Sequence, residues 1–167
     1  MTTVAYAAVT QSGLSFDRQL WMRPEIIPGL RKLTDAIHAE GAAAGIQLGH
    51  CGNMSHKSIC GCTPVGASSG FNLYSPTFVR GLRAGELPEM ARAYGKAVNL
   101  AREAGFDAVE IHAGHGYLIS QFLSPSTNHR KDEFGGSLEN RMRFMDMVME
   151  EVMKAAGSDM AVLVKMN

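Results

Sequence analysis

The sequence predicts an α/β fold in which about four parallel strands are covered by three helices. Four short apolar runs alternate with three longer stretches whose apolar residues recur at helical spacing. This strict alternation implies right-handed crossovers and a parallel sheet. The composition is 46% apolar and 19% charged, as in globular proteins, and 167 residues suffice for only one ordinary domain. We therefore expect residues 1–167 to form a single domain.

The first half of the chain predicts two strands and one helix. Thr2–Val9 is typical of a strand, Pro28–Glu40 of a helix that stops at Gly41, and Gly45–Leu48 of a second strand. The apolar side of this helix is expected to consist of Ile27, Leu30, Leu33 or Thr34, and Ile37. Gly49–Arg83 is rich in Gly, Ser, Pro and Cys, and it predicts a long loop.

The second half predicts two helices and two strands. Glu86–Ala104 is expected to be helical and to end at Gly105, with one face formed by Met90, Tyr94, Ala97 and Ala101. Asp107–His112 predicts the third strand and Ala161–Met166 the fourth. Between them, Ser137 can cap a third helix that Gly157 stops. We expect the core face of this helix to consist of Leu138, Met142, Met145, Met149 and Val152.

The charge balance and the cysteines narrow the classes of partner and of location. Sixteen basic and sixteen acidic residues cancel, which argues against nucleic acid or an anionic membrane and favours a small molecule or a protein. We expect no membrane span and no secretory signal, and hence a cytoplasmic location. Cys51, Cys60 and Cys62 predict neither a disulfide framework nor a structural zinc or iron–sulfur site.

Four polar side chains interrupt the predicted strands. Side-chain alternation places Gln47, Glu110, His112 and Lys165 opposite the apolar residues that face the helices, so they point into the interior of a barrel. Burying such groups costs free energy unless they are paired or bind something. Glu110 and Lys165 could simply neutralise each other. Alternatively, the four groups could surround a polar, planar ligand such as the pyrimidine ring of a flavin, which a cation stabilises in its reduced form.

The third strand ends in a cluster of chemically competent residues. His112, His115 and Tyr117 lie within six residues of one another. Neutral imidazoles can hydrogen-bond and polarise a carbonyl oxygen, and a nearby phenol can supply a proton. The histidines could instead ligate a metal, although no third carboxylate or cysteine stands at a usual spacing. A functional role is favoured over a structural one.

These residues belong to a longer pattern that resembles the old yellow enzyme family, the NADH:flavin oxidoreductases built on a (β/α)8 TIM barrel. The closest similarity is to its branch with 2,4-dienoyl-CoA reductase and NADH oxidases. Gln47-Leu-Gly-His50 resembles the third strand of that barrel, and Val164-Lys165 the fifth. The principal match is His112-x-x-His115-Gly-Tyr117-Leu-x-x-Gln121-Phe-Leu-Ser-Pro125, continued by Asn128-x-Arg130-x-Asp132-x-Phe134-Gly-Gly-Ser137-x-Glu139-Asn-Arg141-x-Arg143-Phe144.

The resemblance implies a role for each of these residues. Gln47 would bind the pyrimidine edge of FMN, and Lys165 would lie near flavin N1 and O2, where many relatives have arginine. His112 and His115 would hold the substrate carbonyl, and Tyr117 would protonate the carbon α to it. Asn128, Arg130, Asp132 and the Gly135-Gly136 turn would order the following loop.

The resemblance covers strands two to five of the barrel, so the fold we expect is a partial, half TIM barrel. The loops after strands seven and eight, which hold the FMN phosphate in such barrels, have no counterpart in this sequence. The implied function is an FMN-dependent NAD(P)H oxidoreductase that reduces activated C=C bonds of a small-molecule alkene. It would require a second barrel half, from another copy or a complementary chain. The alternative is a non-enzymatic half-barrel that self-associates and does not bind flavin tightly.

Overall fold

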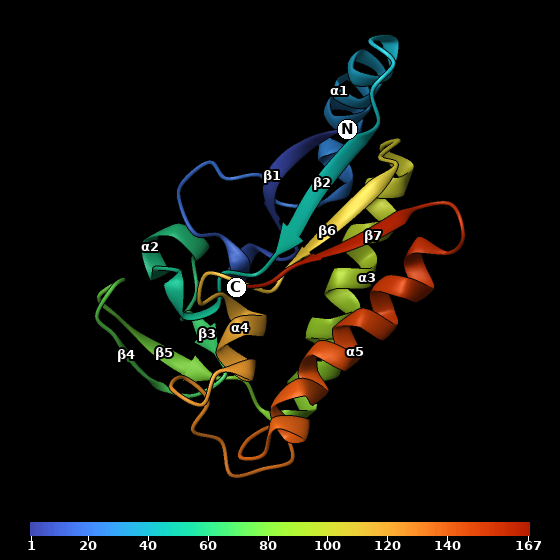
Figure 1. The fold of residues 1–167 in the computed structure, drawn as a ribbon. Helices are drawn as coiled ribbons and strands as arrows, with labels where there is room; N and C mark the ends of the chain where they lie inside the picture. The colour runs from blue at the N-terminus through green and yellow to red at the C-terminus, as the bar shows by residue number, and fades with distance from the viewer.

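A computed structural model describes all 167 residues and places four parallel strands in one sheet. The strands are β1 (Thr2–Ala8), β2 (Ala44–Gly49), β6 (Ala108–His112) and β7 (Ala161–Lys165), and they lie in the order β1-β2-β6-β7. All three pairs of neighbours are parallel. The predicted parallel sheet is confirmed, and its strands end on the side of the molecule that carries α4 (Figure 1).

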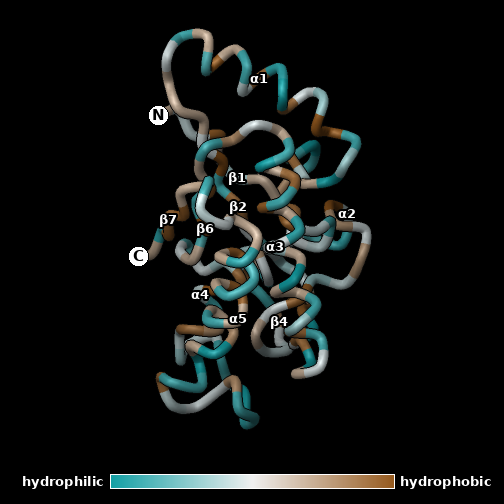
Figure 2. The backbone as a smooth tube through the Cα atoms, turned by 90° about the vertical axis from the view of Figure 1, so that its right-hand side faces the viewer, coloured by the Kyte–Doolittle hydropathy of each residue, from teal (hydrophilic) through white to brown (hydrophobic).

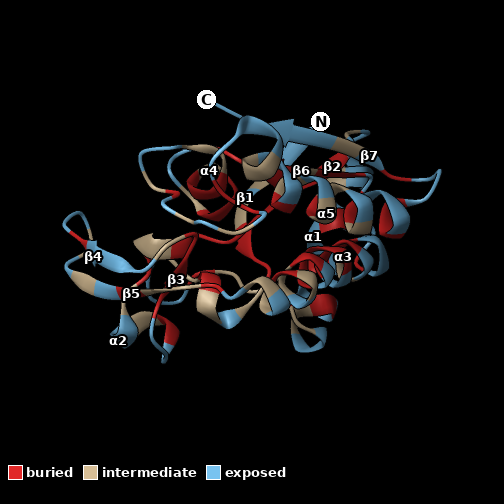
Figure 3. Cartoon of the chain, turned by 90° about the horizontal axis from the view of Figure 1, so that it is seen from below, coloured by how far each residue is buried: buried red, intermediate tan, exposed pale blue.

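Three long helices follow the predicted positions. They are α1 (Ile27–Ala39), α3 (Leu87–Glu103) and α5 (Leu138–Ala156). Helices α3 and α5 pack along each other on one face of the sheet, and the opposite face of the sheet is exposed (Figure 3). Single helical turns complete the set at η1 (Gln11–Gly13), η2 (Pro24–Ile26), η3 (Gly52–Met54) and η4 (Ala84–Glu86).

The predicted helix boundaries have clear local causes. The side chain of Ser137 accepts a hydrogen bond from the backbone N–H of Asn140 at 3.3 Å, as expected of a residue that caps a helix N-terminus. Gly105 follows α3 with φ +87°, a left-handed conformation that residues with a side chain rarely adopt. The predicted start of α5 and the predicted stop after α3 are therefore confirmed.

The prediction that Gly49–Arg83 is one long loop is wrong. The segment contains a short helix, α2 (Lys57–Cys60), and a three-stranded sheet of β3 (Val65–Gly66), β4 (Gly70–Asn72) and β5 (Thr77–Gly81). β5 lies in the middle, parallel to β3 and antiparallel to β4. These strands have two to five residues and are rich in glycine, so they leave little periodicity to detect. A further short helix, α4 (Leu118–Leu123), was also not predicted.

The core lies between the main sheet and the long helices. Ile46 and Leu48 of β2 and Val109 and Ile111 of β6 are fully buried, as their alternation predicts. The sequence left open whether Leu33 or Thr34 lies on the buried side of α1, and Thr34 is the buried residue. Its hydroxyl donates to the backbone oxygen of Ala104 at 2.7 Å.

The predicted core face of α5 is partly wrong. The buried residues of this helix are Phe144, Val148, Val152, Ala155 and Ala156. Leu138 is 54% exposed and Met142 is 38% exposed, while Met145 and Met149 are half-buried. Methionine and phenylalanine occur on adjoining stripes of α5, and packing against α3 and α4 buries the stripe that contains Phe144, whose ring centroid lies 4.5 Å from that of Phe122 on α4.

Strand β7 forms an exposed edge of the main sheet. Leu163, Val164 and Met166 are each more than a third exposed. Figure 2 shows the hydrophobic colouring of this segment at the periphery of the backbone trace. None of the helices is both long and apolar enough to cross a membrane.

Candidate functional site

The polar side chains predicted to share one face of the sheet come together on neighbouring strands. Gln47 is the register partner of Glu110, and His112 is the register partner of Lys165. The side-chain amide of Gln47 donates a hydrogen bond to the carboxylate of Glu110. No ion pair joins Glu110 to Lys165, so mutual neutralisation of these two residues does not account for them.

His112, His115 and Tyr117 form one aromatic cluster at the carboxyl end of β6. The ring centroid of His112 lies 4.8 Å from that of His115 and 5.0 Å from that of Tyr117, and both pairs meet edge to face. The prediction that these three residues lie together is therefore correct in its geometry. Such an arrangement places two imidazoles and a phenol around one small volume.

The backbone after β6 turns sharply to bring His115 back to His112. His115 has φ +55° and Gly116 has φ +67°, so two consecutive residues adopt the left-handed conformation. The backbone N–H of His115 donates to the side-chain oxygen of Asn167 at 2.6 Å. A Cβ atom at Gly114 would lie 2.3 Å from that same oxygen, so a larger residue there would displace the Asn167 side chain from this hydrogen bond. The end of β7 therefore supports the turn that carries His115.

Burial keeps the ring of His112 neutral. The residue is only 2% exposed, and burial, followed by the nearby His115 and Lys165, lowers the pKa of its imidazole to about 4. Its Nδ1 atom is buried and has no hydrogen-bond partner in the chain. A neutral imidazole carries one donor and one acceptor nitrogen. An unpartnered buried ring nitrogen is uncommon, and the hydroxyl of Tyr94 in the core is the only other such side-chain atom in the chain.

Sequence reasoning missed Tyr6, which completes the cluster. Its ring centroid lies 5.2 Å from that of Tyr117 and 6.0 Å from that of His112, and its hydroxyl donates to the backbone oxygen of Gly13 at 2.9 Å. Burial raises the pKa of this phenol well above its usual value. Alternation along β1 could have placed Tyr6 on one face, but only the strand order, with β2 alone between β1 and β6, brings its ring to His112 and Tyr117.

Gln121 holds the loops below the cluster. The amide nitrogen of this buried side chain has two hydrogens to share among three oxygens within hydrogen-bond distance: the backbone oxygens of Cys51 at 3.2 Å and Gly116 at 2.6 Å, and the side-chain oxygen of Asn53 at 2.9 Å. It thereby connects the segment after β2 with the turn after β6. Its contacts are structural, since all of them lie within the protein.

The loop between α4 and α5 is ordered by the residues expected to form a scaffold. Asn128 donates to the backbone oxygens of Phe122 at 2.7 Å and Phe134 at 2.8 Å. Arg130 makes two bonds to the carboxylate of Asp132, at 2.9 and 2.6 Å. The guanidinium also reaches the backbone oxygens of Ala67 and Leu82, which ties this loop to the small sheet. The scaffold role is confirmed.

No group of three or more His, Cys, Asp or Glu side chains is arranged to hold a metal ion. The site therefore consists of a neutral buried imidazole, a second imidazole and a phenol, with an amide, a carboxylate and an ammonium on the adjoining strands. Ligand chemistry at the carboxyl ends of parallel strands is typical of (β/α)8 barrel enzymes. The fold and the site together place the chain in the class of (β/α)8 barrels, of which it forms half.

Comparison with known proteins identifies the family. Residues 1–167 match the NADH:flavin oxidoreductase / NADH oxidase family over their full extent, and the chain belongs to it. A 4,4'-dithiodibutanoate disulfide reductase from Rhodococcus erythropolis is 41% identical over 167 residues, which are 100% of this chain and 41% of that protein. An NADPH dehydrogenase from Bacillus subtilis (strain 168) is 41% identical over 150 residues, 89% of this chain and 44% of its own length.

Solved structures agree with this assignment. The old yellow enzyme homologue from Zymomonas mobilis superposes with a TM-score of 0.91 at 33% identity, over 98% of this chain and 49% of that one. Morphinone reductase in complex with tetrahydroNAD gives 0.92 at 28% identity, over 98% and 50%. The predicted family and the half TIM barrel are therefore confirmed. The chain spans less than half the length of the two curated relatives.

Proposed function

We propose that this chain supplies strands two to five of an FMN-dependent NAD(P)H oxidoreductase that reduces activated C=C bonds. The observation that carries the proposal is the cluster of His112, His115 and Tyr117, in which the buried Nδ1 of His112 has no partner. A carbonyl oxygen of an enoyl or dienoyl substrate would supply that partner. The family assignment supports flavin and nicotinamide chemistry at this end of the sheet.

The three cluster residues have different roles toward the substrate. His112, neutral because its pKa is about 4, and His115 hold the carbonyl oxygen by hydrogen bonds and stabilise the negative charge that develops on it. Tyr117 delivers a proton to the carbon α to the carbonyl. The contact between the Tyr6 and Tyr117 rings, with centroids 5.2 Å apart, restricts where the phenol can point.

The residues of β2 and β7 fit the pyrimidine end of FMN. Gln47 is half-buried, and its amide can both donate and accept hydrogen bonds. Lys165 forms no ion pair within the chain, so its ammonium is available near the end of β6 to offset negative charge on a reduced flavin. Bound FMN would supply the chemistry of hydride transfer between NAD(P)H and the β-carbon of the alkene. The phosphate would be held by the other barrel half.

A complete site would need a second half of the barrel, because the chain matches only about half of each barrel structure. The exposed edge strand β7 and the uncovered face of the main sheet support association with such a half (Figure 3). The same exposed edge favours the second candidate, a half-barrel that self-associates without enzymatic activity. The two candidates differ in whether the protein binds flavin.

The Tyr117→Phe variant tests the proposed proton transfer on FMN-loaded protein. Loss of the phenol should slow reduction of a simple cyclic enone by about 10²–10⁴-fold, the usual contribution of a general acid. Reduction of the flavin by NAD(P)H should stay nearly unchanged. Both rates are measured separately by stopped-flow absorbance.

Tyr94→Phe is the matched control, because Tyr94 is a core residue of α3 whose hydroxyl has no hydrogen-bond partner, and its loss should leave both rates unchanged. An equal loss of both half-reactions in Tyr117→Phe would refute the proton-donor role. A protein that remains colourless and binds no added FMN would instead support the non-enzymatic candidate.

A further inference from the structure

Two cysteines outside the cluster lie within reach of each other. The Sγ atoms of Cys60 and Cys62 are 3.6 Å apart. Cys60 is the last residue of α2, and Gly61 follows with φ +72°, its N–H bonded to the backbone oxygen of Lys57 at 2.9 Å. This left-handed turn folds Cys62 back over the end of the helix, as glycine at this position commonly does. The backbone itself therefore brings the two thiols together.

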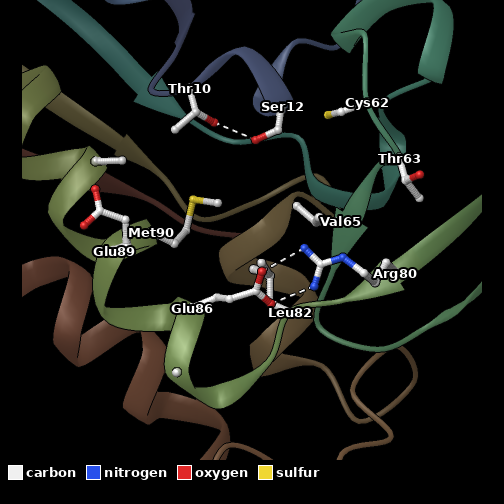
Figure 4. A pocket seen from close by; sticks show the side chains of 12 residues that line it. Thr10, Ser12, Cys62, Thr63, Val65, Arg80, Leu82, Glu86, Glu89 and Met90 are labelled. Carbon is white, nitrogen blue, oxygen red and sulfur yellow. Dashed lines mark hydrogen bonds and ion pairs between the residues drawn. The ribbon is translucent and has the colours of Figure 1, made fainter.

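The two thiols differ in their access to solvent. Cys60 is only 2% exposed, whereas Cys62 is exposed. Cys62 lies on the wall of a cavity of about 620 Å³ (Figure 4), across from α3 and beside Thr63 and Ser12. Cavities of several hundred Å³ accommodate small organic molecules. One thiol is thus accessible to a small reagent, and the other is shielded directly behind it.

We propose that Cys60 and Cys62 are a redox-active dithiol, which low-molecular-weight disulfides that enter this cavity oxidise to a Cys60–Cys62 disulfide. The Cys62 thiolate attacks one sulfur of the small disulfide, whose S–S bond breaks and releases one small thiol. Cys60 then loses its proton and attacks the Cys62 sulfur of the mixed disulfide, which releases the second small thiol. Two protein thiols are oxidised and one small disulfide is reduced to two thiols.

The third cysteine provides an internal comparison. Cys51 is fully buried, and its thiol donates to the backbone oxygen of Leu14 at 3.3 Å. It is a buried, hydrogen-bonded structural thiol without access to the cavity. The proposed pair is also separate from His112, His115 and Tyr117, so it does not depend on the proposed oxidoreductase activity.

The electrostatic surroundings set the rate of the exchange. Burial, together with the neighbouring Cys60, raises the pKa of the Cys62 thiol to about 11, while Arg80 opposes this shift. Arg80 is itself paired with Glu86 at 2.6 Å, and Glu89 lines the same cavity. Since the thiolate is the attacking species, the rate should rise about tenfold per pH unit below that pKa.

The test uses 2-hydroxyethyl disulfide on the reduced, folded chain, followed by intact-mass measurement and peptide mapping. Wild-type protein should lose two hydrogens and contain the Cys60–Cys62 disulfide without a lasting adduct. Cys60→Ser should retain a mixed disulfide on Cys62, whereas Cys62→Ser should not react. Cys51→Ser is the matched control and should behave like the wild type.

Three results would overturn the proposal. One is a wild-type chain that keeps the mixed disulfide on Cys62 without closing the second bond. Another is a Cys51–Cys60 disulfide in the peptide map. The third is a folded chain that does not react, although the same chain unfolded in denaturant does. The peptide map of the wild-type chain tests the proposal even if a serine variant fails to fold.

Discussion

His50 and His112 are buried histidines with very different surroundings. In His50, Nδ1 accepts a bond from the backbone N–H of Gly52 at 2.9 Å, and Nε2 lies 3.0 Å from the hydroxyl of Ser12. In His112 one buried ring nitrogen has no partner. Burial lowers the pKa of His50 to about 3, and burial is also the main cause of the lowered pKa of about 4 at His112. The ring of His50 is therefore fully hydrogen-bonded within the chain, whereas the ring of His112 is not.

These two histidines predict how stability depends on pH. Their folded-state pKa values lie below the unfolded value of 6.5, so the unfolded chain binds more protons as pH falls. The stability that the two neutral rings contribute to the folded chain is fully present above pH 6.5 and is lost as the pH falls toward 4. Below pH 6.5 the free energy of unfolding should approach a slope of roughly 1.4 kcal/mol per pH unit for each histidine. Urea unfolding between pH 7.5 and 5 measures this slope.

The variant His50→Gln should reduce this slope, because one of the two titrating groups is removed. The pH range from 7.5 to 5 lies above the range in which paired carboxylates such as Asp132 titrate in the folded chain, because Arg130 lowers the pKa of Asp132. Stability that is flat between pH 7.5 and 5 would show that neither ring is held neutral.

For individual residues, the sequence predicts those positions that follow from local spacing. His112, His115 and Tyr117 lie on one short segment, so their proximity is nearly a local property. Tyr6 was missed because its neighbours are more than a hundred residues away and depend on the strand order. The free Nδ1 of His112 could not be predicted either, because it depends on every side chain packed around the ring.

Among the elements, the loop from 124 to 137 connects the small sheet with the helical layer. Arg130 is almost completely buried and bonds Asp132 together with two backbone oxygens from the preceding segment. Its guanidinium also lies over the rings of Phe122 and Phe134, at 5.5 and 5.8 Å. One side chain therefore joins three parts of the chain.

Replacing this arginine should be costly. Arg130→Ala leaves the partly buried Asp132 without its partner and two carbonyl groups unsatisfied, so we expect a loss of about 2–4 kcal/mol in the free energy of unfolding. Arg92→Ala on α3 removes an exposed ion pair with Glu89 and should change the free energy of unfolding far less. Denaturant unfolding compares the two variants, and equal losses would contradict the scaffold role of Arg130.

The three long helices and the four strands of the main sheet were predicted to within a residue or two, whereas the short elements between residues 49 and 83 and helix α4 were not. α3 and α5 have enough turns for their apolar spacing to stand out, and α5 also has a capping serine. β3, β4 and α2 consist of two to four residues and arise from tertiary contacts. The buried face of α5 was mispredicted because the contacts with α3 and α4, not the methionine spacing, determine it.

For the molecule as a whole, the exposed edge at β7 predicts association. Unpaired strand edges and exposed apolar side chains favour pairing with another chain. We expect sedimentation velocity to show dimers or larger species, and Leu163→Lys on β7 to shift the protein toward monomer. Met153→Lys on α5, which replaces an exposed apolar side chain outside the sheet, is the control and should leave the distribution unchanged. A wild-type chain that stays monomeric across concentrations would contradict this expectation.

The central claim, that this end of the sheet is half of a flavin site, is tested most directly by FMN titration of the purified protein. Visible absorbance and flavin fluorescence report binding. We expect the wild-type protein to be yellow, or to shift the absorption spectrum and alter the fluorescence of added FMN. The Gln47→Leu variant should bind FMN more weakly. A colourless wild-type protein that leaves the spectrum of added FMN unchanged would contradict it.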